Sequence, residues 1–389
     1  MTSNPTSRDY NKAAVLEVVL SRAPLTRNEL IELTGLSKAT VSRAVEELRG
    51  DGFVVDGGVD AVIGRGRRST YLDVPGSAGH VVGIGFGAQT TCVLVTDLRG
   101  REVKHVIVPT LDEDEAGSAA RWLVDLIRQT SESAEGPVRQ IVAAVPGRVR
   151  NGKEIFGPAE SRKIFAGSAL QRAVEDMVDA PVLLDSDANA SLLGILTEDA
   201  TIGNAALFVF STMLNFASCS EHEIARGRTP TFGDVGVLFS GVDEESLDEL
   251  LSSSGLLRFA RARGLGLDRI EALWLEPSDE ASRAEVLEAF TTAIVTAVSA
   301  VAVTLDPESV YITGRMRPLV DEVLPEVRSR LAQSLPMVPE IKVVTLVLGL
   351  SVARGAAHAG LAMVQNRIRD AVLESRRHPE RPPQPTPAF

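Results

Sequence analysis

The chain has 389 residues, of which 44% are hydrophobic and 24% are charged, which is typical of a soluble globular protein with about two or three domains. That composition excludes a collagen, a coiled coil and a mainly disordered chain, and a total of two cysteines excludes a disulfide scaffold. The net charge of −12 is uneven, because residues 1–75 hold ten basic and ten acidic side chains while the remainder holds 30 basic and 42 acidic ones. An acidic body repels phosphate, so we expect any contact with nucleic acid to involve residues 1–75.

Two helices are predicted at the start of the chain. The first spans residues 8–22, where apolar side chains recur with helical spacing. Its expected buried stripe consists of Ala14, Val15, Val18 and Val19. Thr26, followed three residues later by Glu29, predicts the capping box of a short second helix. This helix is expected to bury Leu30 and Leu33.

A third helix is predicted from about residue 38 to residue 48, after a turn that contains Gly35 and with Ser37 as its N-cap. Two helices joined by a three-residue turn with glycine form a helix-turn-helix, and the start of the second of them faces the major groove of DNA. The residues predicted to contact DNA in this motif are Thr26, Arg27, Ser37, Lys38, Ala39, Thr40, Ser42 and Arg43. A helical hairpin with a solvated face is the alternative interpretation.

A β-hairpin wing is predicted after the third helix. Two β-prone runs, residues 53–55 and 69–74, flank a glycine-rich loop that carries Arg65, Arg67 and Arg68. Arginines can enter a narrow minor groove, and the position directly after a helix-turn-helix favours this role over that of a solvated charged loop. Residues 73–79 then predict a short linker.

The body, residues 80–373, predicts a mixed α/β fold. Hairpin strands between residues 80 and 108 are followed by alternating strands and helices, and the pattern occurs twice, which predicts two lobes with a cleft. Residues 289–305 carry no charge but are at the short limit for a membrane span of ~20 residues. We interpret them as a buried helix, and we expect no membrane partner.

Motifs in both parts of the chain carry a family resemblance. In the first 75 residues they are TRNELIELTGLSKATVSRAVEELRGDGFV and GRGRRSTYLDV. In the body they are VGIGFGAQTTCVLVTDLRG, VAAVPGRV, APVLLDSDANASLLG, GDVGV, LDPESVYITG and LGLSVARGAAHAGLAMV. Over nearly all of residues 8–368 the chain resembles the ROK family (repressors, open reading frames, kinases), in the subgroup with an N-terminal winged helix-turn-helix. The resemblance implies an α/β body with the two-lobed actin/hexokinase-like fold and, in regulators, a sugar-responsive oligomer.

The resemblance divides the chain into four expected parts. They are a winged helix-turn-helix domain in residues 1–75, an N-terminal lobe of the body in residues 80–190 to which a helix of residues 349–368 returns, a C-terminal lobe in residues 191–348, and a disordered tail in residues 374–389. Five of the last eleven residues in this tail are prolines, which favour neither a helix nor a central strand.

The kinase positions of the family are altered. Family kinases carry an aspartate at the position of Gly85, and without it metal and nucleotide phosphates lack a carboxylate partner. The second phosphate loop, which is glycine-rich in the family, corresponds to residues 211–215 and holds no glycine. We therefore expect no enzymatic activity and no cofactor. An active sugar kinase with an accessory DNA-binding head is the alternative.

The zinc and sugar positions differ as well. Val237 stands where the family has a zinc-binding histidine, and Cys219 with His222 forms an isolated C-x-x-H pair, so we expect no metal site. The aspartate that acts as general base in family kinases corresponds to Asp187, and the sugar-binding glutamate corresponds to Asp234. The resemblance thus implies Ser186, Asp187 and Asp234 as contacts of a sugar-like effector. The alternative is that Asp187 caps a helix and Asp234 closes a turn.

The sequence predicts a cytoplasmic transcriptional regulator, a repressor, whose winged helix-turn-helix binds a roughly palindromic double-stranded DNA operator. A small head gains specificity when two copies are held one or two helical turns apart, so we expect a homo-oligomer, either a dimer or a tetramer. The non-catalytic body provides oligomerisation and, if the cleft is used, effector sensing. A DNA-binding protein that needs no effector is the remaining alternative.

Overall fold

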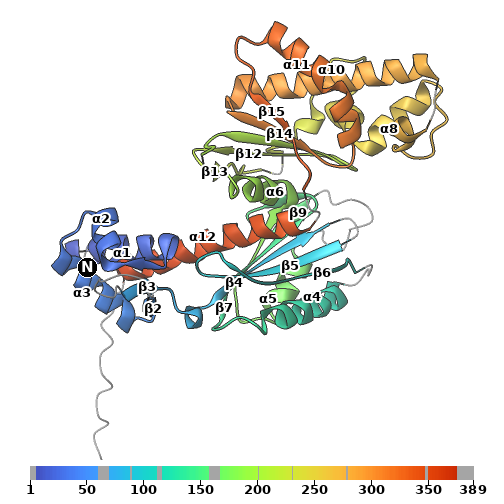
Figure 1. The fold of residues 1–389 in the computed structure, drawn as a ribbon. Helices are drawn as coiled ribbons and strands as arrows, with labels where there is room; N and C mark the ends of the chain where they lie inside the picture. Colours follow the sequence, from blue (N-terminus) through green and yellow to red (C-terminus); the bar gives the residue numbers. More distant parts are fainter. Residues whose placement is uncertain are drawn as a thin grey trace, which may run out of the picture.

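The computed structural model describes residues 6–59, 70–87, 90–111, 116–156, 167–199, 201–229, 231–276, 279–346 and 349–374. Its elements gather in three parts (Figure 1). We call residues 6–59 and 70–75 the head, the sheet of residues 80–186 with its helices the first lobe, and the sheet of residues 205–343 with its helices the second lobe.

The head combines three helices with a small antiparallel sheet. The helices are α1 (Ser7–Arg22), α2 (Arg27–Thr34) and α3 (Lys38–Gly50), and the strands are β1 (Leu25–Thr26), β2 (Val55–Val59) and β3 (Thr70–Asp73), in the order β1-β3-β2. The capping box of Thr26 with Glu29 and the N-cap of Ser37 are confirmed. Gly35 ends α2 with φ of 67°, a left-handed conformation that glycine adopts without strain. The winged helix-turn-helix framework predicted from the sequence is therefore present.

Two details of the predicted head core are wrong. Leu33 is 56% exposed, because the short helix α2 directs only Leu30 into the core. The buried face of α1 is also shifted from the predicted stripe, because Val15 and Val19 are buried but Ala14 and Val18 are only partly buried. Helix α1 packs against both α3 and the C-terminal helix α12. Its buried apolar residues are Ala13, Val15, Leu16, Val19 and Leu20.

The first lobe is a five-stranded sheet in the order β10-β7-β4-β5-β6. Its strands are β4 (His80–Phe86), β5 (Thr90–Asp97), β6 (Glu102–Pro109), β7 (Val138–Val145) and β10 (Val182–Ser186). Helices α4 (Ala116–Ser131) and α5 (Ala169–Glu175) cover one face, and α12 (Leu350–Glu374) covers the other. A small hairpin of β8 (Arg148–Arg150) and β9 (Glu154–Phe156) follows β7.

The second lobe repeats this topology. Its sheet runs β13-β12-β11-β14-β15 and contains β11 (Ala205–Phe210), β12 (Leu214–Ser220), β13 (Glu223–Ile224), β14 (Ser309–Thr313) and β15 (Glu340–Val343). In both lobes an antiparallel hairpin is followed by parallel strands on its other side. One face carries α7 (Leu247–Leu251), α8 (Ser253–Ala262), α9 (Ala272–Leu275), α10 (Glu280–Leu305) and α11 (Arg317–Ser334), and α6 (Asp187–Leu196) covers the other. The repeat confirms the predicted two-lobed α/β body.

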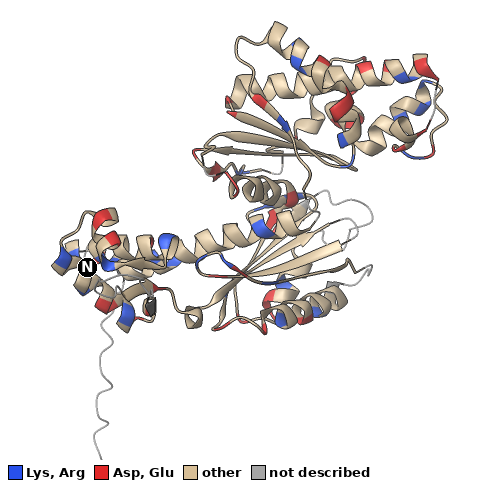
Figure 2. Ribbon diagram, viewed as in Figure 1, with Lys and Arg blue, Asp and Glu red and all other residues tan. Residues whose placement is uncertain are grey.

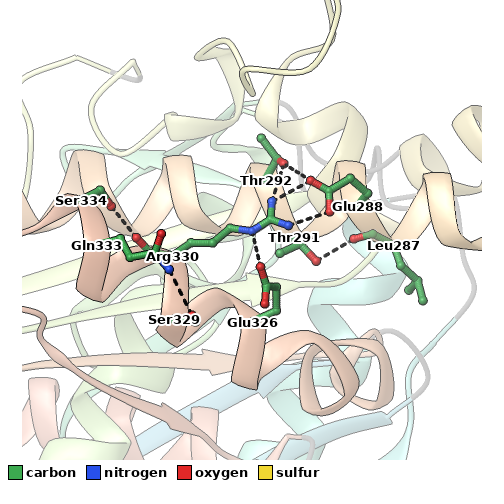
Figure 3. Close-up of polar contacts among 9 residues, drawn as sticks. All are labelled: Leu287, Glu288, Thr291, Thr292, Glu326, Ser329, Arg330, Gln333 and Ser334. Atoms are coloured by element: carbon green, nitrogen blue, oxygen red, sulfur yellow. Dashed lines mark hydrogen bonds and ion pairs between the residues drawn. The ribbon is translucent and has the colours of Figure 1, made fainter.

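The uncharged residues 289–305 lie in α10. This helix is long and apolar enough to cross a membrane by length and composition alone, but half of its most apolar 18-residue window is buried, and its buried face packs in the core of the second lobe. Figure 3 shows an ion pair that joins α10 to α11. Both guanidinium Nη atoms of Arg330 on α11 donate to the carboxylate of Glu288 on α10, at 2.6 and 2.7 Å. The Nε of Arg330 donates to Glu326 at 2.7 Å.

Helix α12 joins the three parts. At its start it lies so close to β4 that a Cβ atom on Gly83 would stand 2.2 Å from the carbonyl oxygen of Ala353. Gly355 approaches α6 in the same way, 1.8 Å from the carbonyl oxygen of Ala190 if a Cβ were added. Further along, the long red helix of Figure 1 reaches the head. Apolar side chains of this part of α12 belong to the core of the head. These side chains are Leu361, Val364, Ile368 and Val372.

Candidate DNA interface and interlobe cavity

The start of α3 presents the predicted DNA-contacting residues at the surface. Ser37, Lys38, Ala39 and Arg43 are exposed, whereas Thr40 and Ser42 are partly exposed. The hydroxyl of Ser37 accepts a hydrogen bond from the backbone N–H of Thr40 at 3.2 Å, which fixes the first turn of the helix. The opposite face of α3 is anchored by buried Val41, Val45 and Leu48, as predicted. The cap and these buried side chains therefore fix which face of α3 points outward.

Charge pairing distinguishes two cations on this face. Three other basic side chains of the head bond to neighbouring acids: Arg8 to Glu47, Lys12 to Asp51, and Arg49 to both Glu46 and Asp56. Arg22, at the end of α1, has no such partner within the described residues. Figure 2 shows acidic and basic residues interspersed over the head. Lys38 and Arg43 have no ion-pair or hydrogen-bond partner among the described residues, so their charges are available to phosphate or to base edges.

The remaining predicted DNA contacts, unlike Lys38 and Arg43, either have bonding partners or lie outside the described residues. Thr26 is partly exposed and is engaged in its capping box, and Arg27 forms an ion pair with Glu46 at 3.2 Å. Arg27 must therefore leave or share that carboxylate in order to reach a phosphate. The wing residues Arg65, Arg67 and Arg68 lie outside the described residues.

A cavity of about 320 Å³ lies between the two lobes. Its wall combines first-lobe residues around β8 and β10 with second-lobe residues of β12 and of the segment after β13. The polar residues of the lining are Arg148, Asn151, Asp185, Ser186, Asn189, Asn215, Ser218, Arg226, Thr229 and Asp234. The lining also has apolar members, of which Phe216 and Phe232 are the largest.

Two ion pairs cross from lobe to lobe in this wall. Arg226 of the second lobe donates to Oδ2 of Asp185, at the end of β10, at 2.7 Å. Asp185 is only 5% exposed, and its Oδ1 accepts hydrogen bonds from Asn189 Nδ2 and from the backbone N–H of Ser186, both at 2.8 Å. In the opposite sense, Arg148 of the first lobe bonds to Oδ2 of Asp234 in the second.

The structure brings together two of the three predicted effector contacts. Ser186 and Asp234 line the cavity, whereas Asp187 is not among the described lining residues. Ser186 is the N-cap of α6 through a 3.1 Å bond from the N–H of Asn189, so the alternative that Asp187 caps this helix is wrong. Asp234 does close a turn, as the alternative stated, because its backbone N–H donates to the carbonyl oxygen of Thr231 at 3.1 Å, and its carboxylate is left to bond to Arg148.

Asp187 occupies an unusual environment. Its Oδ1 is buried and has no hydrogen-bond partner in the described part of the chain. Burial raises the pKa of this carboxyl to about 7, against backbone hydrogen bonds that lower it.

Three residues of the cavity wall were not predicted from the sequence. Arg148 directly follows the Pro-Gly that ends β7, and Asp185 precedes the predicted acid by two positions, so both lay inside recognised motifs. Arg226 lies after the short strand β13, and no sequence pattern placed it beside Asp185, which is 41 residues away.

Gly85 and Val237 stand at the positions of the family's kinase aspartate and zinc-binding histidine. A Cβ at Gly85 would lie 2.5 Å from the carbonyl oxygen of Gly349 and 2.9 Å from the backbone nitrogen of Ala353, so α12 fills the space that an aspartate side chain would need. Val237 is 64% exposed, and the Cys219 thiol donates to the carbonyl oxygen of Gly203 at 3.3 Å. Across the described ranges, no three His, Cys, Asp or Glu residues gather as a metal site.

Comparisons with known proteins agree with this architecture. Residues 81–364 match the model of the ROK family, and residues 9–61 match the model of the MarR family. The xylose repressor of Caldicellulosiruptor bescii is 27% identical over 234 residues, which cover 59% of this chain and 58% of the repressor. The chain thus aligns with somewhat more than half of the length of that relative.

Solved structures share the fold. A crystal structure of a ROK family transcriptional regulator, a homologue of the Escherichia coli MLC protein, superposes with a TM-score of 0.68 at 17% identity and covers 95% of this chain and 98% of its own. The ROK hexokinase of Thermus thermophilus gives a TM-score of 0.62 at 20% identity, covering 74% of this chain and 99% of its own. The ROK model spans the two lobes and most of α12, and on this ground the chain belongs to the ROK family.

Proposed function

We propose that the chain is a cytoplasmic transcriptional repressor that binds double-stranded DNA through its head and that has no kinase activity. The observation that carries the proposal is the exposed start of α3, where Lys38 and Arg43 lack partners within the described residues, in contrast to Arg8, Lys12 and Arg49. The names of the repressor and regulator relatives support it. The loss of space at Gly85 supports a non-catalytic body.

Binding of the full chain to genomic DNA fragments, followed by gel shifts on the selected site, tests this proposal. Lys38→Gln and Arg43→Gln should each weaken binding, by about 1–3 kcal/mol if the side chain reads a base. A purely phosphate contact would instead weaken all sequences alike and lower the salt slope by about 1. Arg49→Gln is the matched control on the same helix, because Arg49 is held by Glu46 and Asp56. Loss of binding in the control but not in the other two variants would contradict the proposed face.

The wing supplies the second part of the proposed interface. We assign Arg65, Arg67 and Arg68 to an adjacent AT-rich minor groove. Arg67→Ala should weaken binding to AT-flanked operators more than to GC-flanked ones in gel shifts. Equal losses on both operators would remove the minor-groove assignment.

We further propose that the operator is roughly palindromic and that a homodimer, or a tetramer of two dimers, holds two heads one or two helical turns apart. Analytical ultracentrifugation of the chain with and without operator DNA checks this. The proposed units are the head in residues 1–75, lobes in residues 80–190 and 191–348, and a tail in residues 374–389, which lies outside the described residues from residue 375 onward.

The interlobe cavity is the proposed effector site, with Ser186, Asp187 and Asp234 as its family-derived residues. Ser186 and Asp234 line it directly, and Asp187 opens α6 next to Ser186. An effector can change DNA affinity only by its difference in affinity between two conformations, and a coupling of ~1–3 kcal/mol corresponds to about 5–150-fold. DNA affinity that no cavity ligand alters would favour effector-independent binding.

A further inference from the structure

We propose that the interlobe cavity binds a small molecule that carries a carboxylate or phosphate group, with the guanidinium groups of Arg148 and Arg226 as its anion clamp. This inference rests on the proposed effector site and names the chemical class of its ligand. Neither arginine was predicted as a ligand contact from the sequence.

The first argument is an excess of donors. A guanidinium has five N–H donors in a planar fork. Within the described residues, Arg226 bonds only through Nη2, to Asp185, and Arg148 bonds only through Nη1, to Asp234. Their side chains are 52% and 38% exposed, so the remaining N–H groups are accessible on a wall that lines the cavity. Paired N–H groups of this geometry match the two oxygens of a carboxylate or phosphate.

The second argument concerns the acids. Asp185 offers about four acceptor positions, and three are occupied, by Arg226, Asn189 and the backbone N–H of Ser186. It is also almost fully buried, so it can accept little from a ligand. Asp185 therefore serves to hold Arg226 and Asn189 in place rather than to bind hydroxyl groups. At the Asp185–Arg226 pair, the four unused N–H groups of Arg226 outnumber the one free acceptor position of Asp185, which favours an acceptor-rich ligand there.

The third argument is the position of the two arginines in the fold. Arg148 belongs to the first lobe and Arg226 to the second, and each bonds to an acid of the other lobe. An anion held by both guanidiniums would bridge the lobes and would weaken their attraction to Asp234 and Asp185. A ligand of this class would therefore have a different affinity for the closed and the open arrangement of the lobes. Such a difference between two conformations is what allows a ligand to change DNA affinity. The cavity volume of about 320 Å³ suits a small molecule.

Isothermal titration calorimetry on the full chain, with matched acidic and neutral probes, tests the clamp. The probes are D-glucuronate and D-glucose 6-phosphate, each against D-glucose, and D-xylonate against D-xylose. At least one acid should bind about tenfold or more tightly than its neutral partner. Preference for glucose 6-phosphate over glucuronate would assign the anion as phosphate, and the reverse preference would assign it as carboxylate.

Variants separate the clamp from the rest of the wall. Arg226→Gln and Arg148→Gln should each lower the affinity for the acid by about 10–100-fold, the usual worth of a hydrogen bond to a charged group. Arg228→Gln is the matched control, because Arg228 is exposed, lies two residues away and is not among the described lining residues. If Arg226→Gln proves unfolded by thermal melting, Arg226→Lys keeps the charge beside Asp185 but loses the fork, and it should also weaken acid binding.

Three results would overturn the proposal: equal affinity for acid and neutral partners, absence of binding by every acid, or unchanged acid affinity in both Arg148→Gln and the folded Arg226 variant. Gel shifts of the wild-type chain without any ligand test the DNA-binding function separately. Calorimetry can therefore contradict the anion clamp while the gel shifts support DNA binding. Equally, the gel shifts can contradict DNA binding while calorimetry supports the clamp.

Discussion

At the scale of single residues, Asp187 combines a buried carboxyl oxygen without a partner in the described residues with a pKa raised to about 7. Its ordinary value is 3.8, so folding favours the protonated form, and the folded state loses stability as the pH rises from about 4 to about 7. Asp187→Asn removes this loss. The variant should match the wild type near pH 4 and should be more stable near pH 8 by about 1–3 kcal/mol, the cost of an unsatisfied buried group.

Thermal melts of both proteins across this pH range give the measurement. Asp125→Asn is the control, since Asp125 is an exposed aspartate on α4 and its replacement should change little at either pH. A wild-type chain at least as stable as Asp187→Asn at pH 8 would mean that the ionised carboxylate has a stabilising partner.

Gly85 supports a second prediction at this scale. Any side chain there meets the backbone of Gly349 and Ala353, so Gly85→Ala should cost about 1–3 kcal/mol through overpacking. Gly50→Ala is the matched control, because nothing lies within 4 Å of a Cβ at that position. Differential scanning calorimetry compares the two variants.

Gly85→Asp should likewise lower stability without creating turnover in a coupled ATP assay with hexoses. Turnover by the wild type that Asp187→Asn abolishes would contradict the non-catalytic assignment.

At the scale of helices and strands, Arg330 on α11 forms one of the ion pairs that join α11 to α10, beside that of Arg283 with Glu322. Its paired bonds to Glu288 and its bond to Glu326 form a partly exposed network (Figure 3). Arg330→Met should lower the free energy of unfolding by about 1 kcal/mol, and less at high salt, because partly exposed ion pairs are weak and screened. Chemical denaturation at low and high salt measures this, with Gln333→Ala on the same helix as the control. A loss that does not depend on salt would indicate packing by the arginine stem instead.

At this scale, local features such as caps, turns and buried strands could be predicted from the sequence, whereas packing between elements could not. Caps and turns are local, so Thr26, Gly35 and Ser37 could be assigned from their immediate neighbours. Buried strands such as β7 and β14 are short apolar runs, and they too were recognisable. The exposure of Leu33 was not, because it depends on what packs against α2 in three dimensions.

The site was predictable only in part, for a related reason. Ser186 and Asp234 came from family motifs, but the pairing of Arg226 with Asp185 joins residues 41 positions apart on different lobes. Neither periodicity nor spacing encodes such a contact. The filling of the space at Gly85 likewise depends on α12, which lies more than 260 positions further along the chain.

At the scale of the whole molecule, the head is fixed to the body rather than tethered to it. Residues 73–79 read as a linker, but Ala78 is buried, and its carbonyl oxygen accepts a 2.7 Å bond from Arg139 Nε. Asp73 pairs with Arg99 of the first lobe at 2.6 Å. Gln365 of α12 donates to the carbonyl oxygens of Leu20 in α1 and Leu98 after β5, at 3.4 and 3.3 Å. The route from cavity to head therefore includes α12 as well as the chain between them.

This route begins at the cavity, where α6 starts at Asp187, directly after its lining residue Ser186. Helix α6 meets α12 at the close approach of Gly355 to Ala190, which leaves little freedom for one helix to move without the other. The far end of α12 places Ile368 in the core of the head. We propose that a shift of α6 on ligand binding reaches α1 and α3 through this rigid helix.

Ile368→Ala tests that connection without requiring a known ligand. The side chain is buried between α12 and the head, so its truncation should cost about 2–5 kcal/mol of local packing. Hydrogen exchange should then accelerate in α1 and α3 while the sheet of the second lobe keeps its protection, and DNA affinity should fall. Asn366→Ala, an exposed position on the same helix, is the control and should change neither. If exchange in α1 stays slow while α12 alone loosens, the head is stabilised independently of α12, and the coupling must pass through residues 73–79 instead.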